Sequence, residues 1–196
     1  MPRKRKHIGT PTAVIDNTLL STLADLELAE YLPQIFRKIR IPPEVKREAY
    51  DARKKGHYKK RLRNLLAENK GFFIDCYEAD VVVKELLMLF IDEGEAAVIA
   101  QAEATKSVVI TDDKAGVKIA QQREIEVFRT GRILCLLKEF GQIDLVTPYL
   151  KKLIKLGFRI TPKIVQDILT ETDELESLRQ LVDLLSKRKV REPVKK

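Results

Sequence analysis

The sequence predicts an α/β fold, in which a central parallel sheet of about five strands lies between layers of helices and is followed by C-terminal helices. One observation is that short apolar runs alternate with longer amphipathic segments up to residue 128, as they do when helices connect parallel strands. A second is that residues 13–15 are continuously apolar, which is typical of a strand buried on both faces. A third is that the pattern after residue 131 is helical throughout.

The predicted strands are the short apolar runs. The second run ends at two prolines, which cannot donate backbone hydrogen bonds to a sheet. The fourth run is the clearest strand of the chain, and the third and fifth are expected to be short. The five predicted strands cover residues 13–15, 39–41, 72–74, 107–111 and 126–128.

The predicted helices are the longer segments with apolar residues at helical spacing. Pro33 is expected to break the first of them into two pieces, because proline lacks a backbone N–H group. Pro42 and Pro43 fit the loop and the first turn of the next helix. Gly94 is expected to separate two helices, the second of which has Glu95 in its first turn. The predicted ranges are 19–36, 44–52, 54–69, 80–91, 95–106, 114–122, 131–140, 144–156, 162–170 and 173–188.

Charge divides the chain into an acidic body with basic segments. The net charge is +8, but residues 1–10 carry +4, residues 46–70 carry +7 and residues 187–196 carry +5, which leaves −8 for the rest. We therefore expect a basic arm at 1–11, a globular domain at 12–170 and a C-terminal helix with a basic tail at 171–196. Such basic segments suit phosphate backbones, although they also serve solubility and surface ion pairing.

A basic helix at about residues 53–70, within the globular domain, is the strongest candidate for contact with a nucleic acid. Tyr58 is interleaved with its basic residues, as in surfaces that follow a phosphate backbone and stack bases. The alternative is an ordinary solvated helix face. The candidate nucleic-acid-binding residues are Lys54, Lys55, Lys59, Lys60, Arg61 and Arg63.

Several classes of protein are excluded by the residues that the chain lacks. The only cysteines are Cys76 and Cys135, far apart and without a CxxC partner, and there are only two histidines, which rules out an ordinary zinc site. The glycine-rich turn of a dinucleotide fold is missing from residues 16–20. The amino terminus has no apolar signal-peptide stretch, and the longest apolar run, 86–91, is too short to cross a bilayer. We expect a cytoplasmic protein with free thiols.

Acidic residues lie at the edges of the predicted elements. Asp16 ends the first strand, and Asp112 and Asp113 end the fourth. The carboxyl ends of parallel strands are where such sheets place their chemistry, and carboxylates gathered there repel one another unless a divalent cation lies between them. Each acid also has an ordinary interpretation, since Asp16 and one of the Asp112–Asp113 pair are suited to capping the helices that follow, and Glu95 suits a helix dipole. Glu48 lies in the second predicted helix, and Glu44, one turn earlier on the same helix, is an alternative to it.

Four segments in order resemble the motifs of the PIN-domain family. In residues 14–18 a strand ends in Asp and is followed by any residue and Thr, and in residues 41–48 a proline-led helix carries Glu one turn in. In residues 94–102 an acid precedes small and apolar residues, and residues 109–113 form a strand leading into Thr-x-Asp. The segments at 141–143 and 157–162 are similar to the end of a prokaryotic subgroup described only as nucleic-acid binding, so the resemblance covers about residues 12–170.

This resemblance implies a site that binds Mg²⁺ or Mn²⁺, the ions that hard oxygen ligands select. The implied catalytic residues are Asp16, Glu48, Glu95 and Asp113. Asp16 and Asp113 would be direct metal ligands, and Glu95 would be a ligand or would hold a metal-bound water. Asp112 is the alternative to Asp113, which the Thr-x-Asp spacing favours. Glu48 would position water or a second metal ion. Thr18 would hydrogen-bond Asp16 or the phosphate, and Asn17 would support the turn after the strand.

The function that the resemblance implies is a metal-dependent endoribonuclease acting on RNA. It also implies a homodimer and, in one branch of the family, the toxin of a toxin–antitoxin pair that an antitoxin protein holds inactive. Two other functions remain open at this point. One is a non-catalytic nucleic-acid-binding protein that keeps the fold, and the other is a nuclease that uses the same pocket to cleave DNA.

Overall fold

The computed structural model describes residues 11–50, 64, 66–68, 71–76 and 80–189. The chain divides into an N-terminal unit, residues 1–130, and a C-terminal unit, residues 131–196. The predicted basic helix at 54–69 falls mostly outside the described residues, of which 64 and 66–68 are helical. All six candidate nucleic-acid-binding residues lie outside them as well. In the described part of the chain, the helices are too short or too polar to cross a membrane.

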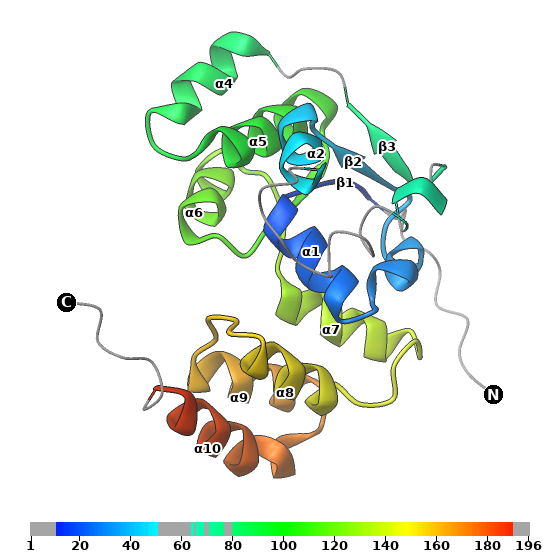
Figure 1. Cartoon of the computed structure of the whole chain (residues 1–196), viewed down its shortest axis with the longest axis vertical. Coiled ribbons are helices and arrows are strands. Elements are labelled where there is room, and N and C mark those ends of the chain that lie inside the picture. The colour runs from blue at the N-terminus through cyan, green and yellow to red at the C-terminus, as the bar shows by residue number, and fades with distance from the viewer. Residues whose placement is uncertain (1–10, 51–63, 65, 69–70, 77–79, 190–196) are drawn as a thin grey trace. The chain divides into compact units, whose positions relative to one another are not determined.

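The N-terminal unit contains a five-stranded, entirely parallel sheet flanked by helices, which confirms the predicted α/β/α fold (Figure 1). The strand order is β3-β2-β1-β4-β5. Strands β2 and β3 extend the sheet to one side of β1, and β4 and β5 extend it to the other, so the direction of winding reverses between β1 and β4. The strands are β1 (Thr12–Ile15), β2 (Lys38–Ile41), β3 (Phe73–Asp75), β4 (Val108–Ile110) and β5 (Val127–Phe128).

Helix α5 is the central helix of this unit. It packs against β1 and β4 and is flanked by α2, α4 and α6. Residues 96–102 of α5 are all buried, and most are small, so this helix has no pronounced polar face. The helices of the unit are α1 (Asn17–Asp25), α2 (Pro43–Tyr50), α4 (Val81–Met88), α5 (Glu93–Thr105) and α6 (Lys114–Gln122), with a 3₁₀ helix, η1, at Ala29–Gln34.

Two predicted breaks in this unit were wrong in position. The segment 19–36 is broken at Leu26–Leu28, where Glu27 adopts a positive φ of 62°, and Pro33 lies within η1. Gly94 lies within the first turn of α5 and does not separate α4 from α5. The separation is made by residues 89–92, with Asp92 capping α5 through a hydrogen bond from the Glu95 amide.

The C-terminal unit is helical, as predicted, with a buried glutamate at its centre. Glu174 accepts hydrogen bonds from the Val146 and Thr147 amides at 2.7 and 2.8 Å, and from Lys138 Nζ at 2.8 Å. It therefore supplies the cap that Val146 cannot give to α8. The predicted helix at 173–188 starts later than expected, since Asp173 has a positive φ, residues 175–177 form a 3₁₀ turn and the α-helix begins at Leu178. The elements are α7 (Thr130–Glu139), α8 (Thr147–Lys155), α9 (Pro162–Glu171), η2 (Leu175–Ser177) and α10 (Leu178–Lys189).

Candidate active site

Asp16 lies at the carboxyl end of the central strand, where the winding of the sheet reverses. Its backbone amide donates to the Ile110 carbonyl of β4, and its Oδ1 caps α1 by accepting from the Leu19 amide at 2.6 Å. The side chain is only 8% exposed. Burial raises the pKa of Asp16 to about 6, against hydrogen bonds from Leu19 and Thr111 that lower it. The capping interpretation is therefore correct, and it leaves the second carboxylate oxygen for another role.

Thr111 connects the ends of β1 and β4. Its Oγ1 accepts a hydrogen bond from the Asp113 amide at 3.1 Å, and the Thr111 side chain also hydrogen-bonds Asp16. Asp113 Oδ1 in turn caps α6, accepting from the amides of Ala115 and Gly116 at 2.7 and 3.0 Å. The Thr-x-Asp spacing thus has a structural cause, since a single hydroxyl fixes the turn that carries Asp113 and contacts the carboxylate of the neighbouring strand.

Asp112 is directed to a different set of partners. Its carboxylate accepts hydrogen bonds from the amide and hydroxyl of Thr130 and lies 3.5 Å from Arg129 Nε. Burial raises the pKa of Asp112, and the hydrogen bonds from Thr130 and the charge of Arg129 oppose that shift. Asp112 therefore links the end of β4 to the segment after β5, although its charge also helps to raise the pKa of Asp16. Asp113 is the one of the pair that hydrogen-bonds Glu95.

Glu95 lies in the first turn of α5 and is surrounded by other acids. Its carboxyl carbon is 3.9 Å from the position that a Cβ would occupy on Gly116 at the start of α6. The pKa of Glu95 is raised to about 8, first by burial and then by the negative charges of Asp92 and Asp113, a side-chain hydrogen bond with Asp113 and the charge of Asp16. Asp16, Glu95 and Asp113 thus repel one another although they come from three separate segments of the chain.

Glu48 of α2 lies next to the first turn of α5. Asn17 Nδ2 donates to Glu48 Oε2 at 3.2 Å. A Cβ on Gly94 would lie only 2.8 Å from Glu48 Oε1, so the glycine makes room for this carboxylate. Asn17 therefore orients an acid and does more than support the turn. We refer to Asn17, Glu48 and Gly94 as the Glu48 clamp.

Glu44 has a structural role that separates it from Glu48. It is 3% exposed and forms an ion pair with Lys84 at 2.7 Å, with Arg47 at 3.7 Å. Burial alone would raise the pKa of Glu44, but the hydrogen bond and charge of Lys84, a backbone hydrogen bond and the charge of Arg47 together outweigh this effect, and the pKa is lowered. Glu44 thus anchors α4 to α2. Glu48 is therefore the glutamate of α2 that is available to the acidic site.

The acids suit a divalent cation by their chemistry. All of them are hard oxygen donors. Asp16, Glu95 and Asp113 also lie near other carboxylates, and none of the described Lys or Arg side chains forms an ion pair with them. Among the described residues, however, no three His, Cys, Asp or Glu side chains converge closely enough to form a ready-made metal site. The donor set therefore fits a hard divalent cation, and ligation requires the carboxylates to move towards a common point.

Sequence reasoning missed two residues of this site. Thr111 was predicted only as part of a motif, and Asp92 was not singled out, although an Asp three residues before Glu95 is a recognisable cap. Thr18 is exposed, and its hydroxyl makes no hydrogen bond to Asp16 within the described residues. Thr111 makes that interaction instead. The suggested contact of Thr18 with a phosphate stays a prediction.

The comparison with known families agrees with this geometry. The family model for the PIN domain matches residues 12–174, which is most of the chain. No curated protein shows significant similarity to the chain. The matched segment contains Asp16, Glu48, Glu95 and Asp113. The chain therefore belongs to the PIN-domain family.

Proposed function

We propose that this chain is a metal-dependent endoribonuclease that hydrolyses RNA phosphodiesters at the acidic site. PIN domains have a nuclease-type fold and are generally hydrolases that use divalent metals. The observation that carries the proposal is the meeting of Asp16, Glu95 and Asp113 where β1, α5 and α6 begin or end. The charges of Asp113 and Asp16 help to raise the pKa of Glu95, and the charge of Asp113 helps to raise that of Asp16. Such a cluster costs folding free energy, and clusters of this kind are concentrated at functional sites.

The residues would divide the work as follows. Asp16, Glu95 and Asp113 would hold Mg²⁺ or Mn²⁺, which, when bound, offsets negative charge on the phosphate and makes water a better nucleophile. Thr111 fixes the positions of Asp16 and Asp113 relative to each other, because its hydroxyl contacts both residues. Glu48, fixed by Asn17, is suited to orienting the attacking water or a second ion. Two oxygens, one each on Asp16 and Asp113, are already used in capping, so each residue would ligate mainly through the other oxygen.

RNA as the substrate, and the toxin of a toxin–antitoxin pair as the biological role, follow from the family resemblance. An antitoxin would inhibit by placing a group in the acidic site. A non-catalytic nucleic-acid-binding protein is the main alternative, and a DNA nuclease is the second. The retained acids favour catalysis over binding alone, because a scaffold gains nothing from carboxylates that repel both one another and a phosphate backbone.

The test is cleavage of a structured, mixed-sequence RNA and of a matched single-stranded DNA with Mn²⁺, Mg²⁺ or EDTA. We expect metal-dependent RNA cleavage that Asp16→Asn and Asp113→Asn each reduce by about a thousandfold or more. Glu103→Gln, a change of an exposed acid on α5 outside the site, is the control and should cleave normally. Salt-sensitive RNA binding without cleavage in every protein would support the scaffold, and preferential cleavage of the DNA would support the second alternative.

A further inference from the structure

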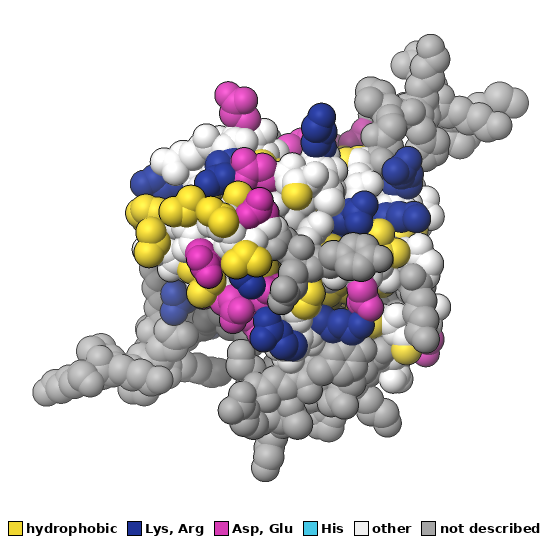
Figure 2. Space-filling view, turned by 90° about the horizontal axis from the view of Figure 1, so that it is seen from above, with side chains coloured by type: hydrophobic (Ala, Val, Ile, Leu, Met, Phe, Trp, Pro, Cys, Tyr) yellow, Lys and Arg dark blue, Asp and Glu magenta, His cyan; other side chains and the backbone are white. Residues whose placement is uncertain are grey.

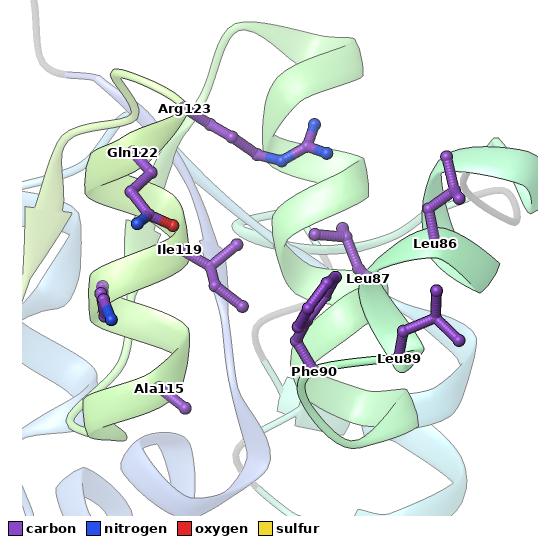
Figure 3. Close-up of a pocket in the computed structure, with 9 residues that line it drawn as sticks. Leu86, Leu87, Leu89, Phe90, Ala115, Ile119, Gln122 and Arg123 are labelled. Carbon is purple, nitrogen blue, oxygen red and sulfur yellow. The ribbon is translucent and has the colours of Figure 1, made fainter.

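Several basic side chains of the N-terminal unit are already paired with acids. Figure 2 shows acidic and basic side chains interspersed over the face that it draws. In Figure 3 the Arg123 side chain points away from α6, and its guanidinium pairs with Glu103 of α5. The ion pair of Lys84 with Glu44 follows the same pattern. These cations therefore have partners within the chain itself.

One stretch of the C-terminal unit has the opposite character. Residues 145–166 run from the loop before α8 into the first half of α9 and contain five basic residues and no acid. Four of the five are exposed and Lys151 is half-buried. Within the described residues none of them forms an ion pair, not even Lys163 with Asp167 one turn later. We call this surface the α8/α9 corner, and its basic residues are Lys151, Lys152, Lys155, Arg159 and Lys163.

The corner is built by a well-defined turn between two helices. Gly157 adopts a positive φ of 92°, and its amide and that of Phe158 donate to carbonyls in the last turn of α8 at 3.2 and 3.0 Å, which is the Schellman pattern. Thr161 then caps α9 with its side chain. Both helices pack against α10 (Figure 1). The last turn of α8, Arg159 and the first turn of α9 are therefore held at one corner of the unit.

Helix electrostatics explain only part of this charge. Lys152 and Lys155 lie in the last turn of α8, where the negative end of the helix dipole favours cations. Lys163 lies in the first turn of α9, where the positive end of the dipole disfavours a cation, and this turn contains no acid. Arg159 lies outside both helices. The fold therefore does not account for Arg159 and Lys163, and a bound anion would stabilise both.

An extended polyanion fits the corner better than a single small ion. Its cations are spread over the ends of two helices and the turn between them, as on surfaces that follow a phosphate backbone. The aromatic residues of this stretch, Tyr149 and Phe158, are both half-buried, so no exposed ring is offered for stacking of bases. We propose that the α8/α9 corner binds the phosphate backbone of RNA without reading its sequence. The choice of RNA rests on the proposed function, whereas the corner contains none of the acids of the active site.

An anionic membrane surface is the main competitor for this corner. Leu156 and Ile164 are exposed beside the basic residues, as on helices that lie on lipid. The apolar face of α8, however, includes Leu153 and Ile154 and is buried inside the protein, so it is not available to enter a bilayer. Two exposed apolar side chains alone add little to the attraction of the charges. The corner therefore favours a partner that is recognised by charge.

The first experiment measures RNA binding without cleavage. The full-length protein is titrated in EDTA against a labelled, mixed-sequence single-stranded RNA at several salt concentrations, and fluorescence anisotropy gives the Kd. The corner variant carries Lys155→Gln, Arg159→Gln and Lys163→Gln. We expect it to bind about tenfold more weakly or worse, with a slope of log Kd against log salt that is smaller by about 2, since each phosphate contact contributes about 0.7. A second RNA of equal length and different sequence should bind with the same affinity.

A charge-matched variant separates the corner from net charge. It carries Lys38→Gln, Lys106→Gln and Lys118→Gln, three exposed positions of the N-terminal unit, and should bind RNA within about threefold of the native protein. The other basic segments of the chain stay in both variants. Lys163→Gln alone should not lower the melting temperature, because it removes a cation from the positive end of α9. Weaker RNA binding at a native melting temperature is a result that a purely structural role does not give.

Three outcomes would overturn the proposal. One is an equal loss of affinity in the corner and charge-matched variants, which would leave only net charge. Another is a corner variant that binds RNA like the native protein. The third is unchanged RNA binding with lost binding to phosphatidylcholine vesicles that contain about a third phosphatidylserine, which would assign the corner to a membrane surface. RNA cleavage is measured separately with Mn²⁺, so a protein that binds RNA at the corner but cleaves none contradicts only the proposed function.

Discussion

Glu174 in the C-terminal unit and Asp16 in the N-terminal unit are both buried carboxylates, 2% and 8% exposed. For both, burial by itself raises the pKa. Lys138 and the amides of Val146 and Thr147 overcome this for Glu174, whose pKa is about 2, whereas Asp16 keeps a pKa raised to about 6. The difference teaches that partners, and not depth, decide whether a buried acid is structural. Glu174 is held by a cation and N–H groups, while Asp16 accepts from the Leu19 amide and from Thr111 but lies among further carboxylates.

The largest effect that the comparison predicts is on stability. Glu174→Ala should destabilise the protein by about 3–5 kcal/mol, because it leaves Lys138 and two amides without their acceptor. Asp16→Asn, at a site of repulsion, should cost far less. Chemical denaturation of both variants measures the difference, and Glu174→Gln should fall between them. Equal losses for Glu174→Ala and Asp16→Asn would remove the distinction between the two regions.

The second prediction concerns pH and metal. Asp16 and Glu95 have raised pKa values, about 6 and 8, so their contribution to stability is present below their unfolded values near 4 and is lost as the pH rises through 6 and 8. Glu174 behaves oppositely, since its contribution is present above about 4.5 and is lost as the pH falls towards 2.

Mn²⁺ should therefore raise the melting temperature more at pH 8 than at pH 6, because the site carboxylates must lose their protons to bind it. At a hundred times the dissociation constant the gain is about 2.7 kcal/mol. Differential scanning fluorimetry with and without EDTA measures it, and Asp113→Asn is the control that should abolish it. The same shift in the Asp113→Asn variant would show that the ion binds elsewhere.

The third prediction concerns the Glu48 clamp. Asn17→Ala and Gly94→Ala should each lower RNA cleavage about tenfold to a hundredfold, the usual loss when a group that orients a functional side chain is removed. Asn17→Asp should be worse than Asn17→Ala, because it places a second charge beside Glu48. Gly71→Ala is the matched control, since a Cβ there meets nothing within 4 Å. Unchanged cleavage in the clamp variants would leave Glu48 with no part in the reaction.

How much of this could be read from the sequence depends on the range of the interaction. The positions of the strands along the chain follow from local patterns, and Asp16 and Asp113 follow from their positions at strand ends, so the parallel sheet and the approximate site were predictable. The choice between Glu44 and Glu48 as the glutamate of the site was not, because it is decided by the ion pair of Glu44 with Lys84, a residue forty positions further along the chain. Glu174 could not be identified either, since its three partners lie 27 to 36 residues before it.

Local backbone strain explains the misplaced breaks. Glu27 and Asp173 each adopt a positive φ without being glycine, a conformation that no residue-level preference indicates strongly. Gly94 attracted the opposite error, because a glycine in a helical pattern normally marks an end. Here the glycine lies inside α5, where the carboxylate of Glu48 leaves no room for a Cβ. This contact cannot be seen in the sequence.

The smallest effect separates the adjacent acids at the end of β4. Asp112→Asn should leave metal-dependent cleavage within about threefold of the native level, because its carboxylate contacts Arg129 and Thr130 and is not turned towards Glu95. It should cost about 1 kcal/mol of stability through the weakened contact with Arg129. Asp113→Asn should do the reverse, with cleavage lost and stability nearly unchanged, because an asparagine still caps α6. If Asp112→Asn abolishes cleavage while Asp113→Asn retains it, the roles of the pair are exchanged, and the rule that a structural acid is recognised by its cationic partner fails at this site.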